Sequence, residues 1–142
     1  MYDKILLTID LTDESSWRKA LPTAVEYCRA FDSTLHLLMV VPDYGMTVVG
    51  HFFPKDYADE VVARSRKELE EFSATHVPPG ITVRHIVAYG TIYEEILITA
   101  RKIAADLIVI GSHRPELKDY LIGPNAARVV RHASCSVLVV RD

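Results

Sequence analysis

Short apolar runs alternate with segments of helical periodicity along the whole chain. The runs lie at residues 4–9, 34–41, 81–88, 106–110 and 136–140, and helix-period segments separate them. This alternation is typical of βαβ units, because two parallel strands must be joined by a crossover that is usually a helix. A run that is almost wholly apolar, such as 34–41, indicates a strand buried on both faces. The sequence therefore predicts an α/β fold with a parallel sheet of five strands and four helices.

Capping and helix-breaking residues suggest where the helices begin. Helical spacing of apolar residues predicts helices near 17–28, 56–75, 92–104 and 124–132. Residues 12–16 supply N-cap side chains for the first helix, and Pro22 predicts a kink or an irregular first turn there. Thr91 and Glu94 predict a capping box on the third helix. Residues 42–54 have no clear period, and we interpret them as a surface excursion.

Composition narrows the classes of function. A chain of 142 residues fits one domain, which we expect to span residues 1–142. The net charge of −3 gives no basic footprint for nucleic acid, and no run approaches the ~18 apolar residues of a membrane span. The first residues lack the pattern of a signal peptide. Cys28 and Cys135 are too few for a disulfide framework and show no metal-ligand spacing. We expect a cytoplasmic protein with no metal site built from protein ligands alone.

Polar residues and glycines gather where strands one and four are expected to end. Ligands of open parallel sheets bind at this edge, where the strand order reverses. The candidate binding residues are Asp10, Val40, Gly111, Ser112, His113, Arg114, Gly123, Pro124 and Asn125. Gly111 permits close approach of backbone to a ligand, and a helix that starts after Gly123 offers free amides to an anion. His113 and Arg114 add donors, so the set suits a phosphate.

Several of these residues also have an ordinary structural interpretation. Gly111 can simply form a turn, Gly123 and Pro124 can punctuate a helix start, and Asp10 can cap a turn. Ser112 stands beside His113, but adjacent loop residues rarely align as nucleophile and base, and no G-x-S-x-G elbow is present. We therefore assign no catalytic residue.

The last third of the chain, GSHRPELKDYLIGPNAARVVRHASCSVLVVRD, resembles universal stress proteins of the UspA family. The segments KILLTID and HLLMVVP also match in place, so the resemblance covers the whole chain. It implies an open, doubly wound, five-stranded parallel sheet ordered 3-2-1-4-5, of the nucleotide-binding α-hydrolase-like type. It further implies that ATP, with or without Mg²⁺, binds in the crevice.

The resemblance also implies roles for individual residues. Asp10 would face the ribose and adenine, Val40 would line the adenine pocket, and residues 111–114 and 123–125 would form the two parts of a phosphate loop. The family motif is Gly, two residues, Gly, nine residues, then Gly followed by Ser or Thr. Here Arg114 replaces the second Gly, the spacer has eight residues, and Pro124 replaces Ser or Thr. With Pro124 the site lacks a backbone N–H donor and a hydroxyl. Each lost hydrogen bond costs ~0.5–1.5 kcal/mol, which a contact between Arg114 and a phosphate can offset. The SHRP version resembles a bacterial subgroup thought to bind ATP.

The last strand bears on assembly. Residues Ser136 to Val140 are apolar on both faces yet are expected at a sheet edge, which favours pairing with a second copy. The resemblance likewise implies a homodimer. We expect a homodimeric, ATP-binding regulatory or sensor protein of the stress response that lacks efficient turnover and acts on a downstream protein partner. Two alternatives stay open: a nucleotide-free dimeric scaffold, and a weak ATPase or self-phosphorylating protein.

Overall fold

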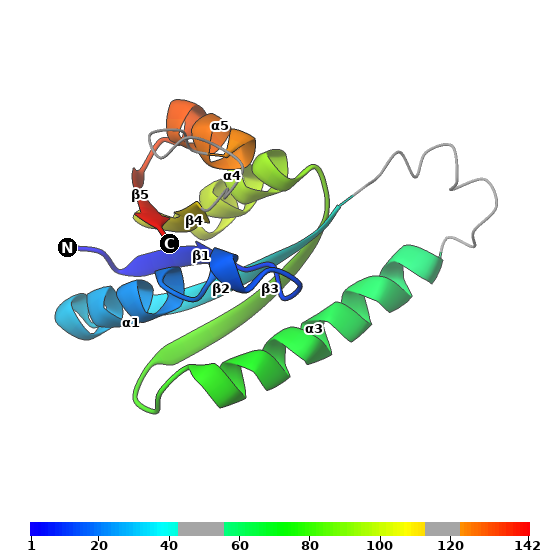
Figure 1. Ribbon diagram of the computed structural model, residues 1–142, viewed down its shortest axis with the longest axis horizontal. Coiled ribbons are helices and arrows are strands. Elements are labelled where there is room, and N and C mark those ends of the chain that lie inside the picture. The colour runs from blue at the N-terminus through cyan, green and yellow to red at the C-terminus, as the bar shows by residue number, and fades with distance from the viewer. Residues whose placement is uncertain (43–55, 113–122) are drawn as a thin grey trace.

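The computed structural model describes residues 1–42, 56–112 and 123–142 (Figure 1). Five parallel strands form one sheet in the order β3-β2-β1-β4-β5. The strands are β1 (Lys4–Thr8), β2 (Thr34–Pro42), β3 (Thr82–Gly90), β4 (Leu107–Ser112) and β5 (Ser136–Arg141). The helices described are the 3₁₀ helix η1 (Glu14–Ser16), α1 (Ala20–Phe31), α3 (Asp56–His76), α4 (Ile92–Ile103) and α5 (Pro124–His132). The predicted α/β fold, strand order and four α-helices are confirmed.

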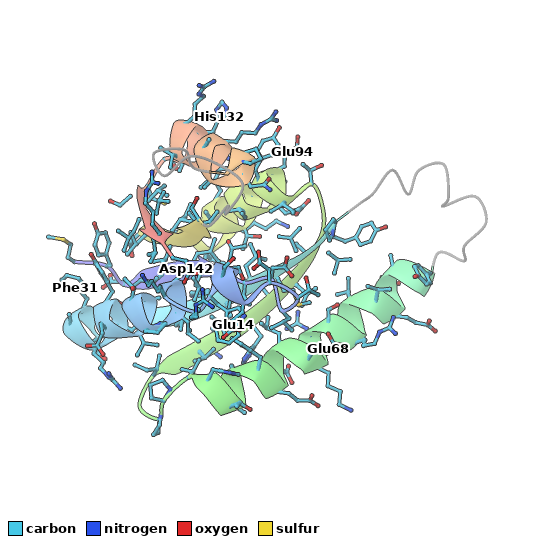
Figure 2. The ribbon with its side chains drawn as sticks, viewed as in Figure 1. Glu14, Phe31, Glu68, Glu94, His132 and Asp142 are labelled. Atoms are coloured by element: carbon cyan, nitrogen blue, oxygen red, sulfur yellow. The ribbon has the colours of Figure 1, made fainter. Side chains whose placement is uncertain are left out.

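Helices cover both faces of the sheet. The strands alternate their side chains between two apolar clusters, so that Ile5 and Leu7 of β1 face α1 and α3 while Leu6 faces α4 and α5 (Figure 1). All three side chains are fully buried. Figure 2 shows the side chains that fill the space between the sheet and its helices. Burial on both faces explains why the strand sequences are apolar runs rather than alternating patterns.

The segment after β1 differs from the prediction. Residues 12–16 do not cap a continuous first helix, because Asp13 instead accepts a hydrogen bond from the Ser15 amide and starts η1. Trp17 then lies between η1 and α1 and packs edge-on against Phe72 of α3, with ring centroids 4.9 Å apart. Pro22 occupies the third position of α1, where a missing N–H removes no intrahelical bond. The predicted irregularity is thus a division into two helices.

The predicted capping box is wrong. Thr91 does occupy the N-cap of α4 in an extended conformation, but its side chain makes no capping hydrogen bond. The Glu94 carboxylate instead accepts a hydrogen bond from the Tyr93 hydroxyl at 3.2 Å. The segment interpreted as a surface excursion lies outside the described residues, apart from Pro42 at the end of β2. Within the described ranges, no helix has the length and apolar character to cross a membrane.

Candidate functional site

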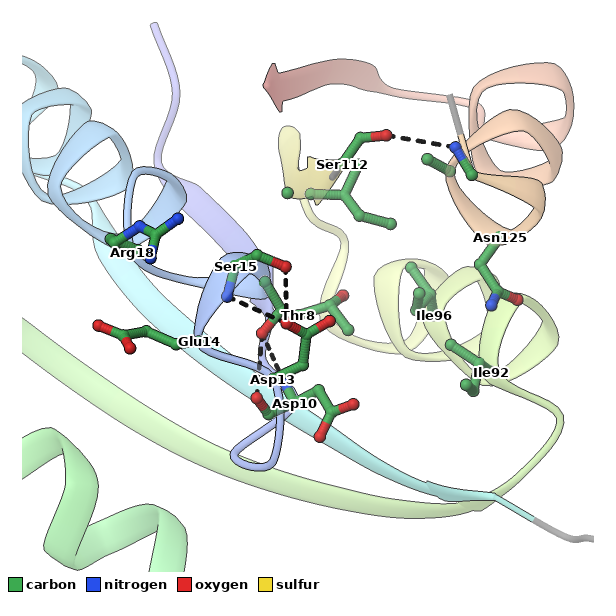
Figure 3. A pocket seen from close by; sticks show the side chains of 15 residues that line it. Thr8, Asp10, Asp13, Glu14, Ser15, Arg18, Ile92, Ile96, Ser112 and Asn125 are labelled. Carbon is green, nitrogen blue, oxygen red and sulfur yellow. Dashed lines mark hydrogen bonds between the residues drawn. The ribbon is translucent and has the colours of Figure 1, made fainter. Parts of the chain in front are cut away.

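A cavity of about 730 Å³ opens at the carboxyl ends of β1 and β4 (Figure 3). Its volume lies within the ~300–1,000 Å³ typical of small-molecule sites. Strand β1 pairs with β2 on one side and β4 on the other, so the cavity lies at the point where the strand order reverses. The lining residues are Thr8, Asp10, Asp13, Glu14, Ser15, Ser16, Arg18, Ile92, Ile96, Ile110, Gly111, Ser112, Gly123, Asn125 and Ala126.

Five of the nine candidate binding residues lie on the wall of this cavity. They are Asp10, Gly111, Ser112, Gly123 and Asn125. They come from the end of β1, the end of β4 and the start of α5, which are far apart in sequence. The sheet therefore brings together the two halves of the predicted site.

The other four candidates differ in position. Pro124 is the first residue of α5 and is exposed beside the wall rather than on it. Val40 packs against the same apolar cluster as Ile92, whose side chain lines the cavity, but Val40 is not on the wall. His113 and Arg114 lie outside the described residues.

Asp10 holds a turn together at the edge of the cavity. Its Oδ1 accepts hydrogen bonds from the Thr12 amide at 2.9 Å and from Thr12 Oγ1 at 2.7 Å. The Asp10 amide donates to Ser16 Oγ, which in turn donates to the Asp10 carbonyl at 3.1 Å. Asp10 therefore has the turn role that the sequence left open, and the same bonds fix its exposed carboxylate at the cavity.

Gly111 lies inside β4 rather than in a turn, and it leaves room for η1. A Cβ at this position would stand 2.5 Å from the Ser16 carbonyl oxygen and 3.3 Å from that of Ser15. The backbone that approaches Gly111 is thus the protein's own. Because Asp13 caps η1 and Glu14 to Ser16 form it, this close approach sets the position of one whole wall of the cavity.

Ser112 joins the end of β4 to the start of α5. Its hydroxyl accepts a hydrogen bond from the Gly123 amide at 3.2 Å. Gly123 is the N-cap of α5, and no acidic residue occupies the helix's first turn. The amides of Asn125 and Ala126 belong to that first turn and have no intrahelical acceptor, so they favour a negative charge at the cavity.

The residues that sequence reasoning missed come mainly from the β1–α1 connection. Thr8 lines the cavity, and its buried Oγ1 has no hydrogen-bond partner within the part of the chain that the structure describes. Asp13 and Glu14 add carboxylates, and Arg18 adds a guanidinium whose pKa is raised further, chiefly by its hydrogen bond to Asp142. Only their position in the sequence could have identified these residues, since they directly follow the strand whose end forms the site.

The donor groups of the described residues limit how a metal ion could bind. Among residues 1–42, 56–112 and 123–142, no group of three or more His, Cys, Asp and Glu is arranged to hold a metal ion. Asp13 Oδ1 already accepts bonds from the Ser15 amide and hydroxyl, at 3.1 and 2.6 Å. A divalent cation at this cavity would therefore need oxygen ligands from a bound phosphate.

Comparisons with known proteins agree with the fold. A family model described as the universal stress protein family matches residues 1–141. Universal stress protein G of Escherichia coli O157:H7 is 32% identical over 145 residues, covering 99% of this chain and 100% of that protein. The solved structure of UspA from Lactobacillus plantarum has a TM-score of 0.69 at 24% identity, covering 99% of this chain and 98% of that one. A universal stress protein solved in complex with cAMP has a TM-score of 0.63 at 20% identity, covering 99% and 97%.

Proposed function

Because the chain belongs to the universal stress protein family, we propose that it is an ATP-binding regulatory or sensor protein of the stress response. The observation that carries the proposal is the cavity that is lined both by Asp10, just after β1, and by the first residues of α5. A relative with the same fold was solved with cAMP, which supports an adenine nucleotide as the ligand class. In this proposal the protein is cytoplasmic and binds the nucleotide without efficiently hydrolysing it.

The charges of the wall suggest an orientation for the nucleotide. Asp10, Asp13 and Glu14 would repel phosphates, but a carboxylate accepts hydrogen bonds well from ribose hydroxyls or an adenine amino group. Ile92 and Ile96 offer an apolar surface for a base on the α4 side. We therefore orient the adenosine toward β1 and α4.

The phosphates would lie toward β4 and α5. Ser112, Gly123 and Asn125 stand there, and the first amides of α5 favour an anion. Pro124 lacks an N–H, but it is the first helical residue, so the amide of Asn125 is still available. Mg²⁺, if it accompanies ATP, would neutralise phosphate charge and be held mainly by phosphate oxygens and water.

A thermal melt of nucleotide-stripped protein tests the proposal. ATP with Mg²⁺ at a hundred times its dissociation constant should stabilise the fold by ~2.7 kcal/mol, which raises the Tm by several degrees, whereas GTP should not. The variant Asp10→Asn keeps an oxygen for the Thr12 bonds but loses the charge, so its own Tm should be nearly unchanged while its ATP-induced shift falls. No shift with either nucleotide would support the alternative of a nucleotide-free scaffold.

The exposed edge at β5 supports a second part of the proposal, a homodimer. β5 is the last strand of the sheet, and its residues Val137 to Val140 are apolar and only half-buried. Such an edge pairs readily with another strand, and a two-fold pairing with a second copy would cover it. Equilibrium sedimentation at micromolar concentration should give twice the 16.0 kDa chain mass. A single species of chain mass would contradict it.

A further inference from the structure

Arg18 is a positively charged residue on a mostly acidic wall. Of the described residues that line the cavity, Asp10, Asp13 and Glu14 are acidic, and Arg18 alone carries a guanidinium. Figure 3 shows this side chain on the same side of the cavity as Glu14 and Ser15. The side chain is 53% exposed, so it can meet a ligand without a large rearrangement of the fold.

Arg18 is held by a carboxylate from the far edge of the sheet. Its Nε donates to Asp142 Oδ1 at 3.1 Å, and its Nη2 donates to Asp142 Oδ2, so the contact is bidentate. The Asp142 side chain is 3% exposed, in contrast to the half-exposed arginine. Figure 2 shows Asp142 near the start of α1, where β5 ends.

This ion pair lies at the same sheet edge as the start of α5. Asp142 follows Arg141, which pairs in register with Ser112 of β4. Ser112 in turn accepts a hydrogen bond from the Gly123 amide. The carboxylate of Asp142 therefore fixes Arg18 at the edge where β4 and β5 end, which is the end of the cavity toward which we orient the phosphates.

A phosphate and a carboxylate compete for the same guanidinium geometry. Arginine binds either group through two parallel N–H donors. A polyphosphate carries more negative charge than one carboxylate. The three acidic residues of the wall repel the phosphates, and a cation next to the phosphates offsets that repulsion. The guanidinium is half-exposed, so a phosphate can approach it from the cavity, whereas the Asp142 carboxylate is buried. Loss of the arginine leaves that carboxylate without this partner, and this energetic cost is subtracted from the affinity for the ligand.

From these contacts, and resting on the proposed nucleotide site, we propose that a phosphate group of the ligand displaces Asp142 from Arg18. Arg18 is then a specificity-determining residue that favours phosphorylated ligands over nucleosides. Asp142 competes with the phosphate for Arg18 and so lowers the affinity. Without ligand, the same pair fastens the end of β5 to the start of α1.

Isothermal titration calorimetry with ATP and with adenosine tests this assignment at one fixed Mg²⁺ concentration. The variants are Arg18→Gln, Asp142→Asn and the double variant, which removes both charges of the ion pair. Arg18→Gln should weaken ATP about fivefold to tenfold, because a bidentate charged contact is lost. Asp142→Asn should tighten ATP about twofold to fivefold, because the competitor is gone. The double variant should match Arg18→Gln, and adenosine should stay within about twofold throughout.

The matched controls are Arg29→Gln and Glu26→Gln. Arg29 Nη1 and Glu26 Oε1 form a 2.5 Å ion pair on the exposed face of α1, and neither residue lines the cavity. These variants make the same net-charge changes and should leave ATP affinity unchanged.

Three results would overturn the assignment while leaving the nucleotide site intact. They are an unchanged ATP affinity in Arg18→Gln, a tightening by Asp142→Asn that persists without Arg18, and an adenosine affinity that shifts as much as that of ATP. A wild-type protein that binds neither ligand would refute the proposed function itself, and the role of Arg18 with it.

Discussion

Replacing Gly111 by alanine tests how η1 is held against the sheet. The added Cβ would stand 2.5 Å from the Ser16 carbonyl oxygen and 3.1 Å from its carbon. Both are backbone atoms, so no side chain can rotate away to make room. To restore a tolerable contact of 3.0–3.4 Å, η1 or β4 must move by about 0.5–0.9 Å.

The clash sets the expected loss in the free energy of unfolding. Overpacking in a well-packed site costs about 1–3 kcal/mol. We expect the upper half of that range, because Ser16 is also tied to Asp10 by two hydrogen bonds that the movement strains. In a chain of this size such a loss lowers the Tm by about 4–10 °C. The shift of η1 should also weaken ligand binding, since η1 forms one wall of the cavity.

Urea unfolding followed by fluorescence measures this loss. Trp17 is the only tryptophan of the chain and directly follows η1, so its native emission reports the displacement. Gly80→Ala is the control: nothing lies within 4 Å of its added Cβ, and its φ of +93° alone costs about 1 kcal/mol. It should leave the native Trp17 emission unchanged. A Gly111→Ala protein within 0.5 kcal/mol of wild type would refute the packing argument.

The remaining predictions concern pH. Asp106 Oδ2 accepts hydrogen bonds from the Lys4 amide at 2.9 Å and the Asp3 amide at 2.8 Å, which lower the pKa of its carboxyl. The contribution of Asp106 to the free energy of unfolding should be complete above the unfolded-state pKa of ~3.9. It should be lost as the pH falls through the lower pKa of the folded state. Urea melts at several pH values should show that Asp106→Ala removes this pH-dependent contribution. Burial, aided by Lys4 and Arg84, lowers the pKa of His36. Stability should therefore fall as the pH drops below ~6.5, and His36→Leu should reduce that loss; an unchanged slope would contradict it.

Most of the fold could be predicted from the sequence, because the β strands are apolar on both faces and the helices are periodic. α5 begins at Pro124 and ends at His132 as predicted, since Pro124 is favoured at a first helical position. The strand ends shift by one or two residues: β4 continues to Ser112, because pairing with β5 extends past the apolar run. Pairing partners decide where a strand ends, and a single sequence does not contain them.

The candidate site was less predictable than the fold. The sequence placed Asp10 and Gly111 at the carboxyl edge of the sheet, and both line the cavity there, because that edge follows from the strand order. It did not reveal that Gly111 admits η1, since this depends on a chain segment about a hundred residues earlier. Nor did it reveal Arg18, whose place on the wall depends on where η1 ends and α1 begins.

The hydrogen bond between Ser112 and the Gly123 amide has a consequence for how such sequences diverge. This hydrogen bond joins the two residues that flank positions 113–122, so it ties the end of β4 directly to the start of α5. Closing a loop that is one residue longer or shorter changes the free energy only slightly. An eight-residue spacer in place of nine is thus an inexpensive evolutionary change. The same junction is a natural place for an engineer to graft a foreign loop.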